Sequence, residues 1–155
     1  MKTLILGIGN TLLSDEGVGI HVLAHLQTGV LPEGVTLLDG GTLSFTLAAS
    51  IQEADTLIVV DAANLRSPPG TLQVFLGQDM DDFLVNNRKS SVHEVGLTDL
   101  RAIALLTGHW PERRALVAIQ PMVVDWGELP SAPVAAAIPA ACAAIHALLE
   151  QWHEH

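Results

Sequence analysis

Short apolar runs alternate with stretches of helical periodicity along most of the chain. Five runs are typical of buried strands: Thr3–Gly7, Val35–Asp39, Thr56–Val60, Leu72–Leu76 and Ala115–Ile119. Four stretches with apolar residues at helical spacing predict helices at about Gly17–Gln27, Ser44–Glu53, Glu94–Leu106 and Ala132–Gln151. This alternation predicts a parallel sheet, and the run LIVVDA at 57–62 is apolar enough to be covered on both faces.

The fourth strand breaks this alternation. The segment AANLRSPPGT, residues 62 to 71, is too short and too rich in proline and glycine to form a crossover helix. Leu72–Leu76 is therefore expected to run antiparallel, at an edge of the sheet. The prediction is an α/β fold in a single domain over residues 1–155. It has three layers, α/β/α, with helices on both faces of a five-stranded, mostly parallel sheet and one antiparallel edge strand.

Composition agrees with a globular domain and narrows its partners. The 155 residues are 49% hydrophobic and 15% charged. Lys and Arg number 7 against 17 Asp and Glu, which gives a formal net charge of −10. Nucleic acids and anionic lipids bind positive faces, so we expect neither nucleic acid nor a membrane as a partner. The single cysteine, Cys142, excludes an internal disulfide framework and fits a reducing compartment.

Two apolar stretches have some features of membrane signals. Near the N-terminus, Gly7 and Gly9 interrupt the run, and no small-residue cleavage site follows. Residues 132–149 carry no Asp, Glu, Lys or Arg, but they include Pro133 and Pro139, which a lipid-spanning helix disfavours. A packed terminal helix explains that stretch better, and the predicted location of the protein is the cytoplasm.

Acidic residues follow three of the predicted strands. Asp15 and Glu16 lie in the loop after the first strand, Asp39 ends the second and Asp61 follows the third. In a doubly wound sheet the carboxyl ends of the parallel strands lie at one end of the sheet, where ligands bind. Carboxylates gathered there repel one another unless a cation or shared protons offset their charge. We therefore expect these four residues around one crevice.

A nucleotide site is the main alternative at this place. The sequence GIG, residues 7 to 9, begins a dinucleotide-binding fingerprint, and Asp39 stands where a ribose-binding acid would end the second strand. Leu12 takes the place of the third glycine, however. Asp15 and Glu16 would also lie close to the phosphates and repel them, so the pattern disfavours a nucleotide.

A metal ion fits the same place better. Glu16 at a helix start, Asp61 at a strand end and a loop histidine can supply three ligands and leave coordination positions open. Of the 7 histidines, His93 in KSSVHEVGL is the best placed, between a polar loop and the helix expected from Glu94. Spacing alone leaves the role of His93 open, because an exposed polar residue beside a helix has the same pattern.

Several other residues are expected to have structural roles. Asp15 is expected to cap the first helix with its carboxylate, Asn10 to form a turn and Cys142 to pack in the core. His21 and His25 lie one helical turn apart, at the expected solvated margin of the first helix. Neither a nucleophile elbow nor the motif His-Glu-x-x-His occurs. A hydrolytic reaction here would therefore use water, activated by a metal or a carboxylate.

Taken in order, GIGNTLLSDEGVG, LDGGT, LIVVDA, SVHEVGL and IQP resemble the hydrogenase maturation endopeptidases, which trim the large subunit of nickel-iron hydrogenases. The resemblance covers nearly the whole chain. It implies a twisted five-stranded sheet, and it implies that Glu16, Asp61 and His93 bind a divalent metal, nickel carried by the substrate. Asp39 matches the acid of the family's Asp-Gly-Gly segment, for which the resemblance implies a catalytic role.

The implied activity is one peptide-bond cleavage that removes the C-terminal tail of the hydrogenase large-subunit precursor after nickel insertion. That precursor is the implied partner. We expect the nickel to arrive bound to cysteines of the precursor, with Glu16, Asp61 and His93 completing its coordination. Two other functions remain open: a non-catalytic nickel chaperone for hydrogenase assembly, which would use the same three ligands, and a nucleotide-binding regulator.

Overall fold

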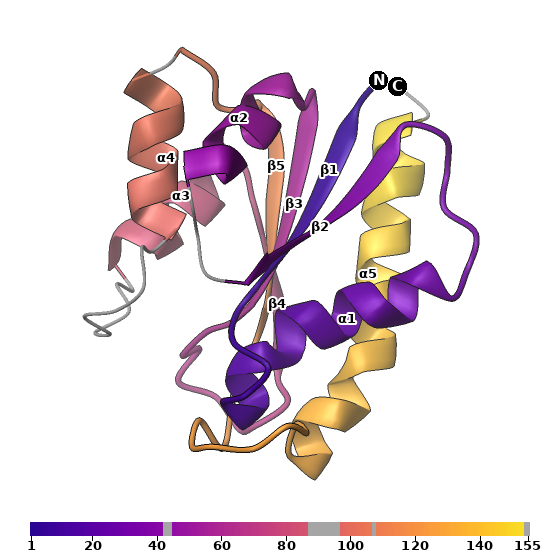
Figure 1. Cartoon of the computed structure of the whole chain (residues 1–155), viewed down its shortest axis with the longest axis vertical. Helices are drawn as coiled ribbons and strands as arrows, with labels where there is room; N and C mark the ends of the chain where they lie inside the picture. Colours follow the sequence, from indigo (N-terminus) through magenta and orange to yellow (C-terminus); the bar gives the residue numbers. More distant parts are fainter. Residues whose placement is uncertain (42–44, 87–96, 107, 154–155) are drawn as a thin grey trace.

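A five-stranded sheet runs through the centre of the molecule (Figure 1). The computed structural model describes residues 1–41, 45–86, 97–106 and 108–153. The strands are β1 (Thr3–Ile8), β2 (Val35–Gly41), β3 (Thr56–Ala62), β4 (Leu72–Leu76) and β5 (Arg113–Ile119). Their order across the sheet is β2-β1-β3-β5-β4, and all neighbours pair in parallel except β4, which runs antiparallel to β5. The predicted mixed sheet with one antiparallel edge strand is confirmed.

Helices cover both faces of the sheet, because side chains alternate between the faces along each strand. In β1, Ile5 packs in a core with α1 and α5, whereas Leu4 and Leu6 pack in a second core with α2, α3 and α4. The helices are α1 (Val18–Gln27), α2 (Phe45–Glu53), α3 (Gln78–Asn86), α4 (Leu97–Leu106) and α5 (Ala132–His153). This is the predicted three-layer α/β/α arrangement (Figure 1).

Helix α3 is the element that the apolar pattern does not predict. It is short and acidic, and its buried side chains are Met80, Asp81 and Leu84. The Asp81 carboxylate accepts hydrogen bonds from Nε and Nη2 of Arg114 in β5, at 3.0 and 2.7 Å. An ion pair with a strand that is distant in the sequence therefore holds this helix in place. The periodicity of apolar residues does not reveal such a contact.

The other helices differ from the predictions only at their ends. A short 3-10 helix, η1 (Ser14–Gly17), precedes α1, so the regular helix begins one residue later than predicted. The helix predicted from Glu94 is confirmed from Leu97 onward, and its first three residues lie outside the described part of the chain. Helix α5 continues through Pro139 as one helix.

Helix α5 is long and apolar enough to cross a membrane by length and composition alone. One side of it packs on α1 and on the sheet, with Val134, Ile138, Ala141 and Ile145 buried. That packing explains its apolar character as that of a core helix, which is what the sequence predicts.

The direction of the strand order reverses next to β1. From β1 the chain passes through α1 to β2 on one side, and from β2 it passes through α2 to β3 on the other side. Ligands of doubly wound sheets bind outside the carboxyl ends of the strands at such a reversal. The carboxyl ends of β1 and β3, which point toward the lower part of Figure 1, are therefore the place to seek a functional site.

Candidate functional site at the carboxyl end of the sheet

Two glycines bring the loop after β1 close to the end of β3. A Cβ atom at Gly9, where φ is +135°, would overlap the backbone carbonyl oxygen of Glu16. A Cβ atom at Gly19 would overlap the carbonyl oxygen of Val60 and would lie 2.6 Å from that of Ile8. Only glycine permits so close an approach of two backbones. The glycines of the GIG and GVG segments are therefore explained by the packing of η1 and α1 onto the strand ends.

Glu16 and Asp61 both lie at this end of the sheet. Glu16 is half-buried in η1, which contacts β3. Asp61 is the next-to-last residue of β3 and is only 5% exposed. Gly19 of α1 lies against the carbonyl oxygen of Val60, which directly precedes Asp61. This contact brings the start of α1, and η1 before it, close to Asp61. Two of the three predicted metal ligands are thus brought to one end of the sheet by neighbouring elements.

Asp39 lies at the same end of the sheet but on the far side of β1 from Asp61. It is exposed and in register with Gly7 of β1. Two inter-strand spacings, about 10 Å, separate the backbone of β2 from that of β3. Leu37 packs in the core of α1 and α5 and Val59 in the other core, so alternation directs Asp39 and Asp61 to opposite faces. The catalytic role of Asp39 stays a prediction.

His93, the third predicted ligand, lies outside the residues that the structure describes. Within the described ranges, no three His, Cys, Asp or Glu side chains form a group that could hold a metal ion. The complete three-residue site therefore stays a prediction. The chemistry of the predicted set is consistent with nickel, because two carboxylates and an imidazole combine hard and borderline ligands for a divalent cation.

Contrary to the expectation from the sequence, Asp15 does not cap the first helix, and neither η1 nor α1 has a side-chain capping hydrogen bond. Its buried carboxylate instead accepts hydrogen bonds from the 121–131 loop. The donors are the backbone N–H groups of Met122 and Val123, each at 2.8 Å, and the N–H and hydroxyl of Ser131, at 2.6 and 2.8 Å. Four converging donors satisfy a carboxylate more fully than the end of a helix can.

The pKa of the Asp15 carboxyl is lowered from its ordinary value. Burial by itself raises this pKa, because it takes the charged form out of water. The hydrogen bonds from Val123, Met122 and Ser131 stabilise the carboxylate and together outweigh burial. Asp15 therefore stays ionised at neutral pH and holds the 121–131 loop beside Glu16.

Hydrogen bonds of Leu12 and Ser14, which precede Asp15, also join the loop after β1 to the 121–131 loop. The N–H of Ser14 donates to the carbonyl of Gly127, and the N–H of Gly127 donates to that of Leu12, both at 2.8 Å. The Ser14 hydroxyl donates to the carbonyl of Asp125, also at 2.8 Å. Ser14 has a φ of +51°, a conformation that is costly for a residue with a side chain and persists where its surroundings fix it. The two loops thus form one rigid unit.

Gln120, in the segment IQP, joins a third loop to this unit. Its side-chain Oε1 accepts a hydrogen bond from the N–H of Leu65 at 2.6 Å. Its backbone accepts from the N–H of Gly70 and donates to the carbonyl of Thr71, both at 2.9 Å. The connection from β3 to β4 is thereby held against the end of β5, beyond Asp61.

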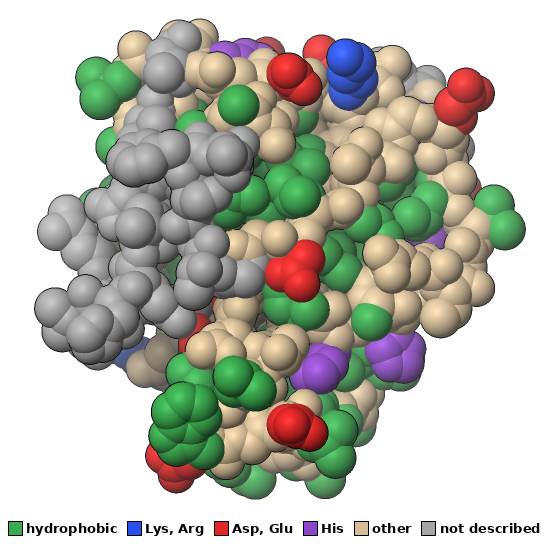
Figure 2. All heavy atoms as spheres, viewed as in Figure 1, with side chains coloured by type: hydrophobic (Ala, Val, Ile, Leu, Met, Phe, Trp, Pro, Cys, Tyr) green, Lys and Arg blue, Asp and Glu red, His purple; other side chains and the backbone are tan. Residues whose placement is uncertain are grey.

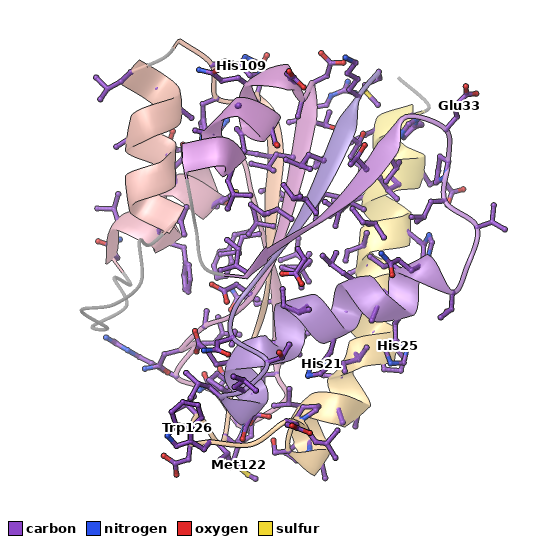
Figure 3. The ribbon with its side chains drawn as sticks, in the orientation of Figure 1. His21, His25, Glu33, His109, Met122 and Trp126 are labelled. Carbon is purple, nitrogen blue, oxygen red and sulfur yellow. The ribbon has the colours of Figure 1, made fainter. Side chains whose placement is uncertain are left out.

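Asn10 and Cys142 have the structural roles expected of them, and the two histidines of α1 do so in part. Asn10 forms a turn, in which its Oδ1 accepts a hydrogen bond from the N–H of Leu12 at 2.9 Å. Cys142 is partly buried against the core of α1 and α5, and burial raises the pKa of its thiol, which disfavours the nucleophilic thiolate. His25 is exposed at the margin of α1, as expected (Figure 3), whereas His21 is half-buried and its Nε2 is shielded from solvent, so only His25 lies at a solvated margin.

Comparison with known proteins agrees with this architecture. Residues 20–148 match the model of the hydrogenase maturation protease family. The chain is 38% identical, over 97% of its length and 75% of the relative, to the hydrogenase expression/formation protein HupD of Rhizobium leguminosarum bv. viciae. It is 35% identical, over 78% of its length and 74% of the relative, to the hydrogenase 2 maturation protease of Escherichia coli strain K12. The structure of the E. coli hydrogenase maturating endopeptidase HybD has a TM-score of 0.89 at 31% identity, covering 97% of this chain and 93% of that one.

The fold and these similarities define a peptidase, so the predicted endopeptidase class is confirmed. More particularly, the chain belongs to the hydrogenase maturation protease family. Membership of a protease family also favours an enzyme over a non-catalytic chaperone.

Proposed function

We propose that this chain is the endopeptidase that removes the C-terminal tail of a nickel-iron hydrogenase large-subunit precursor after nickel insertion. The observation that carries this proposal is the packing of η1 on β3, which gathers Glu16 and Asp61 at the carboxyl end of the sheet in a member of this family. One domain over residues 1–155 performs the reaction, in the cytoplasm.

Productive positioning of the substrate for cleavage depends on nickel that the precursor carries. Glu16, Asp61 and His93 complete the coordination of this nickel, which cysteines of the precursor hold. Two carboxylates gathered at one end of the sheet repel each other without a cation, so a substrate that brings a divalent cation gains favourable electrostatic energy there. Coordination of the substrate's metal also places the adjoining peptide bond for attack.

Asp39 acts as the general base in hydrolysis. It is exposed, so water reaches it. It lies at the same end of the sheet as the proposed ligands but across β1 from Asp61 and on the other face, so this role requires the scissile bond to lie between the bound nickel and Asp39. The Asp39 carboxylate accepts a proton from water as the water oxygen bonds to the carbonyl carbon of the scissile peptide. The carbon–nitrogen bond then breaks, and the leaving amine takes the proton. The products are the shortened subunit and the free tail.

The test compares nickel-loaded with nickel-free precursor at equal concentration, with free nickel removed by a chelator. One cut in the nickel-loaded precursor, seen on a gel and by mass spectrometry, is the expected result, and the nickel-free precursor should remain whole. Efficient cleavage of the nickel-free form would overturn nickel recognition. Transfer of nickel to this chain from an uncut precursor would show a chaperone instead.

Matched variants test the ligand set. Glu16→Gln should lower the rate of cleavage about 100-fold or more, because it weakens the positioning of the substrate. Glu33→Gln is its control, since Glu33 is exposed and lies well away from the carboxyl end of the sheet (Figure 3). His93→Ala should have the effect of Glu16→Gln, and His25→Ala, at an exposed histidine, should cleave like the wild type. Circular dichroism checks that each variant is folded.

A further inference from the structure

The 121–131 loop exposes several large apolar side chains. Met122, Val124, Trp126 and Leu129 of this loop and the neighbouring Leu12 are exposed, Trp126 by 81% and Leu129 by 77%. We call these five residues the apolar patch. Figure 3 shows Met122 and Trp126 projecting from the end of the molecule below α1, and Figure 2 shows hydrophobic side chains with acidic ones beside them at that end. Exposed apolar patches on a soluble domain mark surfaces that bind a partner.

The exposure of the patch is fixed by the hydrogen bonds beneath it. The Asp15 carboxylate holds the backbone on both sides of Trp126, at Met122, Val123 and Ser131. The 2.8 Å hydrogen bonds between Ser14 and Gly127 and between Gly127 and Leu12 hold its centre. A surface ordered in advance binds with little loss of conformational entropy.

The loop that carries the patch is joined to the candidate site. Asp15, which holds the loop, directly precedes Glu16, a proposed ligand of the substrate's nickel. Both the loop after β1 and the loop after β5 leave the carboxyl end of the sheet. A molecule whose nickel is bound at Glu16 is therefore brought next to the patch.

The charge around the apolar patch indicates which partner can bind there. Asp125 and Glu128 are exposed among the apolar side chains, and the chain has a net charge of −10. A second copy would place acidic rims against each other, and an anionic membrane would be repelled. A partner with an apolar centre and a rim of Lys and Arg is complementary to this surface.

We propose that the apolar patch is the docking surface for the large-subunit precursor, which presents an apolar area with a basic rim. This inference rests on the proposed function, since it takes the substrate from it. Trp, Met and Leu side chains of the patch supply the apolar contact, and Asp125 and Glu128 pair with basic side chains of the precursor. Docking here holds the body of the precursor while its tail is cut.

The test measures binding of the nickel-free precursor to the immobilised chain, so neither nickel recognition nor cleavage enters the readout. Leu129→Ser should raise the Kd about tenfold, and Trp126→Ser should raise it more. Leu106→Ser is the matched control: Leu106 is 88% exposed at the end of α4, and its Kd should stay within about twofold of the wild type. On nickel-loaded precursor, the two loop variants should raise KM and leave kcat unchanged.

An unchanged Kd in both folded loop variants overturns the docking proposal, and so does a wild type that fails to bind the precursor. If Leu129→Ser weakens binding but the wild type cuts no precursor, the docking proposal stands and the proposed function is refuted. Sedimentation and vesicle flotation test the other occupants. The precursor is overturned as the occupant if the wild type forms a dimer that Trp126→Ser dissociates. It is also overturned if the wild type binds vesicles with phosphatidylglycerol and Trp126→Ser abolishes that binding.

Discussion

The carboxylate of Asp15 accepts hydrogen bonds from both the backbone N–H and the hydroxyl of Ser131, across 116 positions of sequence. Ser131 directly precedes α5, so this contact ties the start of the terminal helix to the loop after β1. Since Glu16 follows Asp15, the same carboxylate that orders the 121–131 loop also sets where a proposed nickel ligand lies. The effect of Asp15 on stability can therefore be separated from its effect on the position of Glu16 only by comparing matched variants.

Replacing Asp15 with Asn should lower the free energy of unfolding by about 3 kcal/mol. The amide NH2 group would face N–H donors that need an acceptor, and the charge-assisted hydrogen bonds would be lost. Urea denaturation followed by circular dichroism measures the change. Asp125→Asn, exposed on the same loop, should change stability by less than about 0.5 kcal/mol. Equal stability of Asp15→Asn and the wild type would contradict this account of the loop.

The lowered pKa of Asp15 predicts a loss of stability in acid. A carboxyl whose folded pKa lies below its ordinary 3.8 contributes its full stabilisation above that pH and loses it as the pH falls through the folded pKa. As the pH falls below about 4, the free energy of unfolding should fall more steeply for the wild type than for Asp15→Asn. Parallel pH profiles of the two proteins would show that Asp15 does not titrate in this window.

Gly19→Ala should destabilise the fold by about 3 kcal/mol, because the new methyl group would overlap the Val60 carbonyl and push α1 from the strand ends. Gly29→Ala is the control, since a Cβ atom there meets only the Leu26 carbonyl oxygen, at 3.9 Å. Thermal and urea denaturation compare the two variants. A wild-type stability for Gly19→Ala would mean that α1 can shift at no cost.

Asp81→Ala should lower stability by about 3 to 5 kcal/mol, because it leaves the charge of the mostly buried Arg114 without its carboxylate partner. Arg114 lies near the start of β5, away from the carboxyl end of the sheet, so kcat of the folded variant should not change. Asp79→Ala, exposed on the same helix, should cost less than about 1 kcal/mol. A lowered kcat in folded Asp81→Ala would connect α3 to the site.

Much of the fold could be predicted because its signals are local. The run LIVVDA becomes β3, and the apolar spacing of residues 132–151 becomes α5, since burial on one or two faces imposes its period on the sequence. Helix α3 could not be predicted in this way. Its Asp81 is stabilised by Arg114, 33 positions later, and no local pattern records that contact.

The candidate site likewise has features that the sequence predicts and features that it does not. The positions of Glu16 and Asp61 follow from the rule that carboxyl ends of parallel strands lie together, which needs only the order of the elements. The role of Asp15 could not be found, because all its partners lie more than 100 positions away and a capping role explains its local sequence equally well. The exposed side chain of Trp126 also has no local signal, since a loop tryptophan is more often covered.

Asp39→Asn separates catalysis from binding at the site. The amide keeps the size of the side chain and removes its basicity, so general-base catalysis should fall, with kcat on nickel-loaded precursor lowered about 100-fold or more. Asp39 is exposed at the end of β2, in register with Gly7, so the exchange should leave the fold and the Kd for the precursor unchanged. Single-turnover cleavage and equilibrium binding measure the two quantities separately. Asp55→Asn, on an exposed aspartate at the start of β3, is the control and should cleave normally. If Asp39→Asn cleaves at the wild-type rate, another group activates the water, and Asp39 is left with only a structural role near the end of β2.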